Sequence, residues 1–317
     1  MHRRRTPLFT ALAFLGLVAA CDRPTQQSTA PAAPMFSAAN AEPQDTALLR
    51  RMGEINAQLA GSGLKIAVEA IEFFTIGVGR PSARIHQQEF RWVPNDPRRL
   101  ADGENITYLV DQSDGRTASG LTSAQTEAAI DNALTTWAND PPLKNVTIVK
   151  RPDPRTDPDI FDFFFGFGGF GDPFLADIVD AGWLPRAYFE AVGGPGGGRG
   201  ILAFSVTFIF VDDVTGVPTD INGDAYLDTA LNEVYYNNTF GDRRDDRAGN
   251  PWGISVALPG IDVETVALHE NGHSLELGHF GPPPDAVMNP RYAGIRHVPF
   301  PADDAGMNAV WSSWPNP

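Results

Sequence analysis

The stretch LHENGHSLELGH at 268–279 constrains this 317-residue chain more than any other feature. It brings His269, His273 and His279 within eleven residues, although the whole chain has only six histidines. Residues four apart lie on one face of a helix, so the first two histidines can bind the same Zn²⁺ ion. Asp262 is suited to cap a helix that begins here. The pattern therefore predicts a zinc site on a helix, and the alternative is a helix with surface histidines.

Glu270 lies between the two histidines of the expected helix. Zinc lowers the pKa of a bound water to about 7, and a carboxylate beside the open coordination position can accept its proton during attack on a carbonyl. This predicts a hydrolase with zinc as cofactor and Glu270 as the catalytic general base. The alternative is a non-catalytic envelope module with a structural metal site, although such a site has no need of a carboxylate at this position.

A methionine follows the third histidine by nine residues, within the segment AVMNP at 286–290. Here the sequence resembles the metzincin zinc peptidases, and among them the matrixins, whose pattern is HExxHxxGxxH followed by a methionine turn. The resemblance implies that the three histidines are the zinc ligands, that Glu270 is the general base and that Met288 lies under the metal. It also implies an endopeptidase that hydrolyses proteins or peptides.

The matrixins carry an acidic pair at the start of their last helix. The segment PADD at 301–304 resembles that pair, which implies that Asp303 and Asp304 brace the methionine turn. The alternative is an ordinary helix start, because the helix dipole favours acidic residues there.

The family glycine after the second histidine is absent, because Glu276 stands at its position and the glycine comes two residues later, as Gly278. A non-glycine residue can take the left-handed conformation at a cost of about 1–2 kcal/mol. The helix could instead run on and turn at Gly278. A third alternative makes Glu276, rather than His279, the third zinc ligand.

The resemblance implies an α+β fold for residues 101–317: a metzincin-like catalytic domain with a mixed twisted sheet, a backing helix, the zinc-binding helix and the methionine turn. The expected elements are strands at 106–110, 146–149 and 201–211 and a helix at 122–139.

Residues 45–100 are expected to form an N-terminal subdomain that could be a pro-segment. Its expected elements are a helix at 45–60 and a strand at 64–76, with 88–93 as the partner of that strand. Many matrixins are kept latent by a pro-segment cysteine on the zinc, but the only cysteine here is Cys21. A latency group from 45–100 would have to be another residue, for which His86 is a candidate.

The N-terminus resembles a secretory targeting signal. Three arginines precede an apolar run that ends in LVAAC, so residues 1–20 are predicted to be a signal peptide. The ending resembles a bacterial lipobox, which implies lipidation of Cys21; ordinary cleavage after Ala20 is the alternative. Residues 21–44, rich in Pro, Ala, Gln, Ser and Thr, are expected to be a flexible tether. The protein is then exported, either anchored to a membrane of the cell envelope through lipid or secreted.

The formal net charge of −15 argues against nucleic acid as a partner. A second ion site is conceivable in the loop 220–228, where Asp220, Asn222, Asp224 and Asp228 have the spacing of calcium ligands. Two other positions of a calcium loop do not fit, since Ala225 and Leu231 replace Gly and Glu. The alternative is a turn closed by Asp and Asn side chains.

Overall fold

The structure is a computed structural model that describes residues 45–317 apart from 78–79, 81, 87, 100–102, 170, 172, 246–248 and 316–317. The predicted signal peptide, the tether and Cys21 lie outside the described residues. Within the described residues, none of the helices is both long enough and apolar enough to cross a membrane.

A mixed sheet of eight strands forms the centre of the fold, in the order β2-β1-β7-β8-β6-β4-β5, with β3 paired to β8 beside this path. Strands β5, β4, β6 and β8 are parallel to one another, whereas β7 is antiparallel to β8 and β1 is antiparallel to β7. The sheet strands are β1 (Ile66–Thr75), β2 (Ala83–Arg84), β3 (Phe90–Arg91), β4 (Ile106–Val110), β5 (Ile148–Lys150), β6 (Ile178–Leu184), β7 (Ile201–Phe210) and β8 (Leu227–Asn237).

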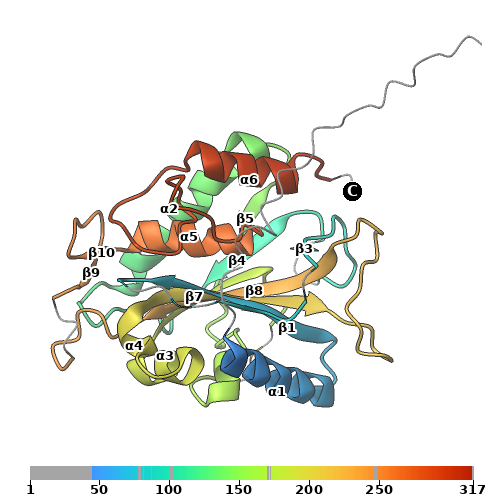
Figure 1. Cartoon of the computed structure of the whole chain (residues 1–317), viewed down its shortest axis with the longest axis horizontal. Coiled ribbons are helices and arrows are strands. Elements are labelled where there is room, and N and C mark those ends of the chain that lie inside the picture. The colour runs from blue at the N-terminus through green and yellow to red at the C-terminus, as the bar shows by residue number, and fades with distance from the viewer. Residues whose placement is uncertain are drawn as a thin grey trace, which may run out of the picture. The chain divides into compact units, whose positions relative to one another are not determined.

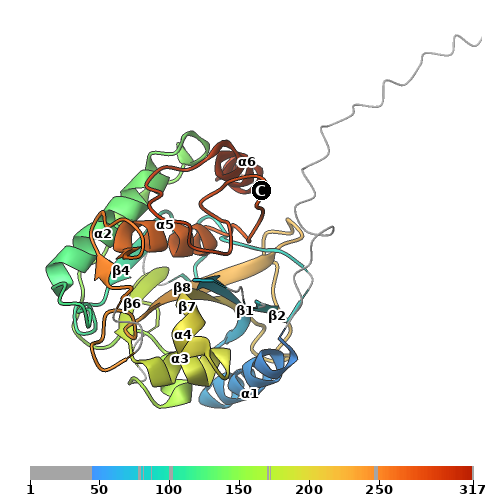
Figure 2. The ribbon, with the colours of Figure 1, turned by 60° about the vertical axis from the view of Figure 1, so that its left-hand side comes forward.

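Helices cover both faces of this sheet (Figure 1). One face carries α2 (Ser123–Ala138), α5 (Val263–Ser274) and α6 (Pro301–Trp311), and the other carries α1 (Thr46–Ser62), α3 (Arg186–Gly193) and α4 (Gly197–Gly200), as Figure 2 also shows. The short elements are β9 (Trp252–Gly253), β10 (Ile261–Asp262), η1 (Pro141–Leu143) and η2 (Asp162–Phe165). The predicted α+β fold with a mixed sheet and a backing helix is confirmed.

Each face of the sheet has its own hydrophobic core. The core beside α2, α5 and α6 includes Trp137, Val266 and Met288. The core on the other face takes Leu48, Met52, Ile55 and Leu59 from α1, which repeat at helical spacing and are buried. The zinc-motif helix α5 therefore lies between the sheet and a layer of two further helices, which fixes its position.

The N-terminal segment is part of this sheet. Strand β1 pairs with β7 over its whole length and with β2 at its outer edge. The prediction that 88–93 pairs with β1 is wrong, because β3 lies in that stretch and pairs in parallel with the start of β8. Two residues of β3 suffice for this pairing, because Trp92, which follows them, is fully buried and holds the segment in place.

Candidate active site and metal centre

Helix α5 begins and ends at residues with specific partners. At its N-cap, the Asp262 carboxylate accepts a hydrogen bond from the Thr265 amide at 2.9 Å, as the sequence predicted for this position. Three tryptophan indoles donate to carbonyls of the helix and its end, at 2.8–3.0 Å: Trp137 to Leu268, Trp92 to Ser274 and Trp311 to Leu275. Because these groups come from three separate elements, α5 is fixed from several sides.

The chain leaves α5 through a left-handed residue. The helix ends at Ser274, and Glu276 has φ of 74°, so the expectation of a non-glycine residue in this conformation is confirmed and the alternative turn at Gly278 is wrong. The Glu276 amide donates to the His273 carbonyl at 2.7 Å. Its side chain turns toward β8, where Oε1 accepts from the Thr229 hydroxyl at 2.8 Å. Glu276 therefore lies outside the cluster of histidines, contrary to the alternative in which it is a ligand.

This turn brings the three histidines together. Their Nε2 atoms lie 3.1 Å (His269 to His279), 3.2 Å (His269 to His273) and 3.1 Å (His273 to His279) apart. Zinc–nitrogen bonds of 2.0–2.1 Å in a tetrahedron would place the nitrogens about 3.3–3.4 Å apart. The three ring nitrogens thus match a tetrahedral zinc site with a fourth position left for another ligand.

Hydrogen bonds on the opposite ring nitrogens set the tautomers. Nδ1 of His269 donates to the Val287 carbonyl at 2.7 Å, and Nδ1 of His273 donates to the Leu277 carbonyl at 2.6 Å. With Nδ1 protonated, the Nε2 lone pairs face one another, an arrangement that a cation stabilises. Burial lowers the pKa of His269 and of His279 well below its usual range, and the adjacent imidazoles add to this. Both rings are therefore neutral, as metal ligands must be.

Glu270 is fully buried, and neither of its carboxylate oxygens has a hydrogen-bond partner among the described residues. Burial raises its pKa well above the usual range, and the charges of Glu72 and Asp180 add to the effect. Buried carboxylates are normally paired with a hydrogen-bond donor or a cation. An unpaired carboxylate that follows His269 directly in α5 is therefore suited to interact with a bound ligand.

The methionine turn packs directly against α5. Met288 is fully buried, and its sulfur lies so near Gly272 that a Cβ at that glycine would be 2.4 Å from Sδ. The Val287 and Met288 amides donate to the Asp303 carboxylate at 2.8 and 3.1 Å. Since Val287 also receives the His269 hydrogen bond, Asp303 is linked to a zinc ligand through the turn.

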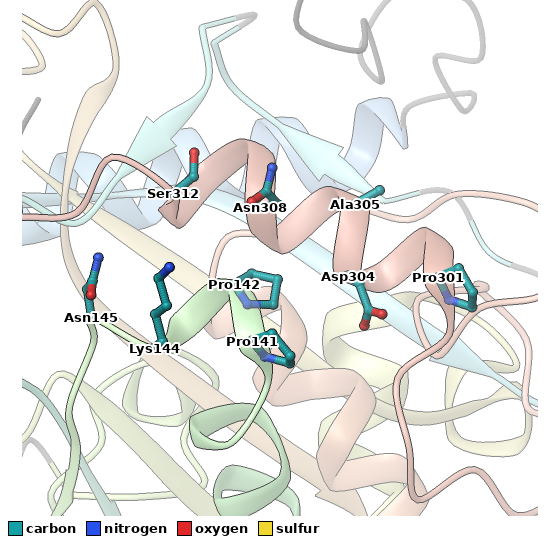
Figure 3. Close-up of a pocket in the computed structure, with 9 residues that line it drawn as sticks. All are labelled: Pro141, Pro142, Lys144, Asn145, Pro301, Asp304, Ala305, Asn308 and Ser312. Atoms are coloured by element: carbon teal, nitrogen blue, oxygen red, sulfur yellow. The ribbon is translucent and has the colours of Figure 1, made fainter.

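Asp304 points elsewhere. It lines a hollow between α6 and η1, which contains none of the histidines (Figure 3). Burial raises the pKa of Asp140, which precedes η1, to about 6, and the charge of Asp304 adds to the effect. The contacts expected of a bracing residue are therefore made by Asp303, whereas Asp304 faces another acidic group.

The end of β1 reaches the histidines, which the sequence did not suggest. The Phe74 ring stacks on the His269 ring, with centroids 3.8 Å apart and planes within 11°. A carboxylate oxygen of Glu72 lies 3.1 Å from Nδ1 of His273. Burial opposes ionisation of Glu72, but its charge and hydrogen-bond interactions with His273 outweigh it and lower the pKa to about 2. Glu72 contacts the ring nitrogen opposite Nε2, so it lies outside the ligand set.

His86 does not approach the histidine cluster, since its Nδ1 pairs with Glu69 of β1 at 2.6 Å. The loop 220–228 is closed by its own hydrogen bonds. Asp220 accepts from the amides of 223, 224 and 225, and Asp228 forms an ion pair with Arg98 at 2.7 Å. The calcium interpretation of this loop is not supported, and the alternative of a turn closed by Asp and Asn side chains describes it.

Residues 207–312 match the family model for the matrixins (Peptidase_M10). Over this segment the chain is similar to the matrixins, a family of metzincin zinc peptidases. The matched segment runs from β7 to the end of α6 and contains the zinc helix, the turn at Glu276 and the methionine turn. No curated protein gives a significant match to the chain. The metzincin resemblance drawn from the motif is thus confirmed, and the matched segment contains the cluster of His269, His273 and His279.

Proposed function

We propose that the protein is a zinc-dependent endopeptidase in which Glu270 is the general base. The observation that carries this proposal is the convergence of three Nε2 atoms beside a buried carboxylate without a partner. A zinc ion held by His269, His273 and His279 would activate a water and polarise the peptide carbonyl. A structural metal site would explain the histidines but not the unpaired Glu270, so the non-catalytic alternative is not favoured.

The chain's own groups have separate tasks in this mechanism. The Val287 and Leu277 carbonyls hold the two helical imidazoles with Nε2 unprotonated. Glu270 accepts a proton when the nucleophile attacks and returns it to the leaving amine.

The substitution Glu270→Gln tests the mechanism. It should leave zinc content unchanged and lower casein hydrolysis by at least about 100-fold, because the ligands remain while the proton acceptor is lost. Glu264→Gln, in the first turn of the same helix, is the matched control and should keep both zinc and activity. Hydrolysis by Glu270→Gln at the wild-type rate would show that the mechanism is wrong.

We further propose that β1 keeps this site closed, which gives the N-terminal segment the role of a latency element. An extended peptide commonly binds a protein by adding a strand to the edge of a sheet. Strand β7 lies against the zinc-motif helix α5 and could receive a strand on the side away from β8, but β1 already pairs with it there. On the other side of β1, Thr75 exchanges backbone hydrogen bonds with Pro290 and Tyr292, just after the methionine turn. β1 thus connects β7 to the segment after the methionine turn, and its side chains contact two of the histidines.

The latency element is shorter than the predicted subdomain 45–100. Arg99 forms an ion pair with Asp177 at 2.9 Å in which both side chains are buried, and Trp92 holds the end of α5. Loss of these residues would leave a buried charge and a helix end unpaired. The part that can leave while the catalytic domain stays folded therefore ends before β3, and includes α1 and β1.

Neighbouring phenylalanines of β1 provide a test. Phe74 faces the histidines, whereas Phe73 faces α1 in the opposite core. Both are nearly fully buried, so Phe74→Ala and Phe73→Ala should each destabilise the strand by about 3–5 kcal/mol. If β1 acts by closing the site, Phe74→Ala should raise hydrolysis of a short peptide several-fold more than Phe73→Ala does. Equal effects, or a lower rate for Phe74→Ala alone, would contradict the latency proposal.

Localisation is proposed on the sequence of the N-terminus. We infer that the chain is exported and that Cys21 is lipidated, so that the tether at 21–44 links the catalytic domain to a membrane of the cell envelope. The apolar run before the cysteine and its small-residue ending support this. Several acyl chains on one residue give stable anchoring, whereas a single chain binds only marginally.

A further inference from the structure

A second cluster of acidic residues lies away from the histidines. Asp111 follows β4 directly, and Asp114 lies in the same loop. The other members, Asp157, Asp159 and Asp162, come from the segment between β5 and β6, where Asp alternates with Pro and a run of Phe and Gly follows. The ligand oxygens of 111, 114 and 157 lie within 4.8 Å of one another, and so do those of 157, 159 and 162. Asp157 belongs to both groups.

These carboxylates have no basic side chain as an ion-pair partner in the described part of the chain. Other buried acids of this protein do: Asp177 pairs with Arg99, and Asp228 pairs with Arg98. In the cluster, burial raises the pKa of Asp162, and the charge of Asp157 adds to the effect. For Asp114, burial with the charges of its acidic neighbours raises the pKa to about 6. The cluster therefore lacks the positive countercharge that Asp177 and Asp228 have.

Asp162 provides an independent indication of a ligand. Its side chain is only 2% exposed and points into the cluster, yet Oδ1 has no hydrogen-bond partner among the described residues. The loop that follows closes around it: a Cβ at Gly168 would lie 1.9 Å from Oδ2 of Asp162, and the Gly169 amide donates to Asp157 at 2.7 Å. The Asp162 side chain also contacts the Asp159 carboxyl, so its unpartnered oxygen lies beside a second carboxylate, where a bound cation would satisfy it.

We propose that this cluster is a calcium site in which Asp157, Asp159 and Asp162 are ligands and Asp111 and Asp114 complete the negative shell. The donors are all carboxylate oxygens, which calcium prefers over the nitrogen and sulfur donors favoured by zinc. Calcium–oxygen bonds of 2.3–2.6 Å allow ligand oxygens on opposite sides to be about 4.6–5.2 Å apart, in keeping with the spread of these groups. Magnesium, at 2.0–2.1 Å, requires a tighter shell.

The site would fix the irregular segment between β5 and β6 onto the sheet. The Asp111 amide donates to the Asp180 carbonyl of β6 at 3.0 Å, and the Asp159 carboxylate accepts from the Tyr235 hydroxyl of β8 at 3.1 Å. An ion among these loops therefore links β4, β6 and β8. This role does not depend on the proposed peptidase activity.

Calcium titration of the full chain, stripped of metal and reloaded with zinc alone, tests the proposal. Calcium should raise the melting temperature of the wild type by several degrees, and Tb³⁺ should bind with luminescence sensitised by nearby aromatic rings. Asp162→Asn should weaken both responses by at least 10-fold without changing zinc content. Asp157→Asn, at a less buried position, should do the same and guards against misfolding of the first variant. Asp224→Asn, in the loop 220–228, is the matched control and should respond like the wild type.

A further signature separates ion binding from a merely structural role. Asp162→Asn removes a repulsive charge, so without calcium the variant should melt at or above the temperature of the wild type, while its response to calcium is lost. The proposal is overturned if the wild type shows no calcium response, if both cluster variants keep it, or if Asp224→Asn abolishes it.

Discussion

The substitution Asp303→Asn measures how far the methionine turn depends on one carboxylate. Asp303 is fully buried, and its two oxygens accept from the Val287 and Phe300 amides at 2.8 Å and from the Met288 amide at 3.1 Å. An asparagine can retain only one of these oxygens. The NH₂ group of the asparagine would take the place of the other oxygen. It would then face a backbone N–H group, and two hydrogen-bond donors would point at each other.

The expected loss follows from these contacts. A hydrogen bond to a charged group contributes about 1.5–3 kcal/mol, and a buried donor without a partner costs about 1–3 kcal/mol. Burial raises the pKa of Asp303 despite its backbone hydrogen bonds, so removal of the charge recovers part of this loss. We therefore expect a decrease of about 2–4 kcal/mol in the free energy of unfolding. An exposed acid that acts only on the helix dipole would contribute about 0.3–1 kcal/mol.

Urea denaturation of the zinc-loaded protein gives this quantity directly, with Asp304→Asn as the matched control. Asp304 faces Asp140 instead of the turn, so its replacement should change stability by less than about 1 kcal/mol. Asp303→Asn should also reduce zinc affinity, because the Val287 carbonyl that orients His269 would shift. A loss below 1 kcal/mol for Asp303→Asn, or equal losses for the two variants, would refute the bracing role.

Three further predictions concern the third ligand, the pH dependence of stability and the anchor. His279→Ala should lower zinc occupancy severely, whereas Glu276→Gln should retain zinc; metal analysis of both variants decides this, and the reverse result would contradict the assignment of His279 as the ligand. Burial raises the pKa of Glu276 to about 8, so the folded state keeps a proton on this carboxyl that the unfolded state releases above about pH 4.5. The stability of the wild type should therefore fall as the pH rises from 5 to 8, and the stability of Glu276→Gln should fall less. Cys21→Ser should abolish lipid labelling and release the protein from the membrane fraction, and unchanged membrane association would argue for ordinary cleavage and a protein partner.

Local patterns in the sequence predicted the zinc helix well. The spacing of His269 and His273, the Asp262 cap and the apolar face of α2 depend on residues close in sequence, so they can be read without the fold. The position of Met288 came from the family resemblance, which supplied a contact that spacing alone does not encode.

Two central strands, β6 and β8, were not predicted. Both contain polar residues at fully buried positions, which hides the apolar pattern of a strand. Asp180 of β6 accepts from the Tyr236 hydroxyl of β8 at 2.5 Å, and Asn232 of β8 accepts from the Thr207 hydroxyl of β7 at 3.1 Å. These polar groups are buried because neighbouring strands satisfy them, and that pairing is known only once the strand order is known.

The contacts of β1 with the histidines were also beyond prediction. Glu72 and Phe74 are separated from α5 by nearly two hundred residues, and the antiparallel pairing of β1 with β7 brings them together. The strand itself was predicted from its β-branched and aromatic residues. Its location in the sheet was not, because such residues indicate a strand without indicating its neighbour.

Glu276 shows how a distant contact can replace a family residue. The third histidine reaches the cluster because residue 276 adopts a positive φ, and glycine is the residue that does so at least cost. For glutamate the conformation costs about 1–2 kcal/mol. The hydrogen bond from Thr229 offsets about 0.5–1.5 kcal/mol of this conformational cost. The side chains of Leu275 and Leu277 are buried and fix the backbone on either side. The requirement at this position is therefore a backbone conformation, and glycine is only the usual way to meet it. A search for the motif by residue identity alone would miss a chain in which the tertiary structure enforces the same turn.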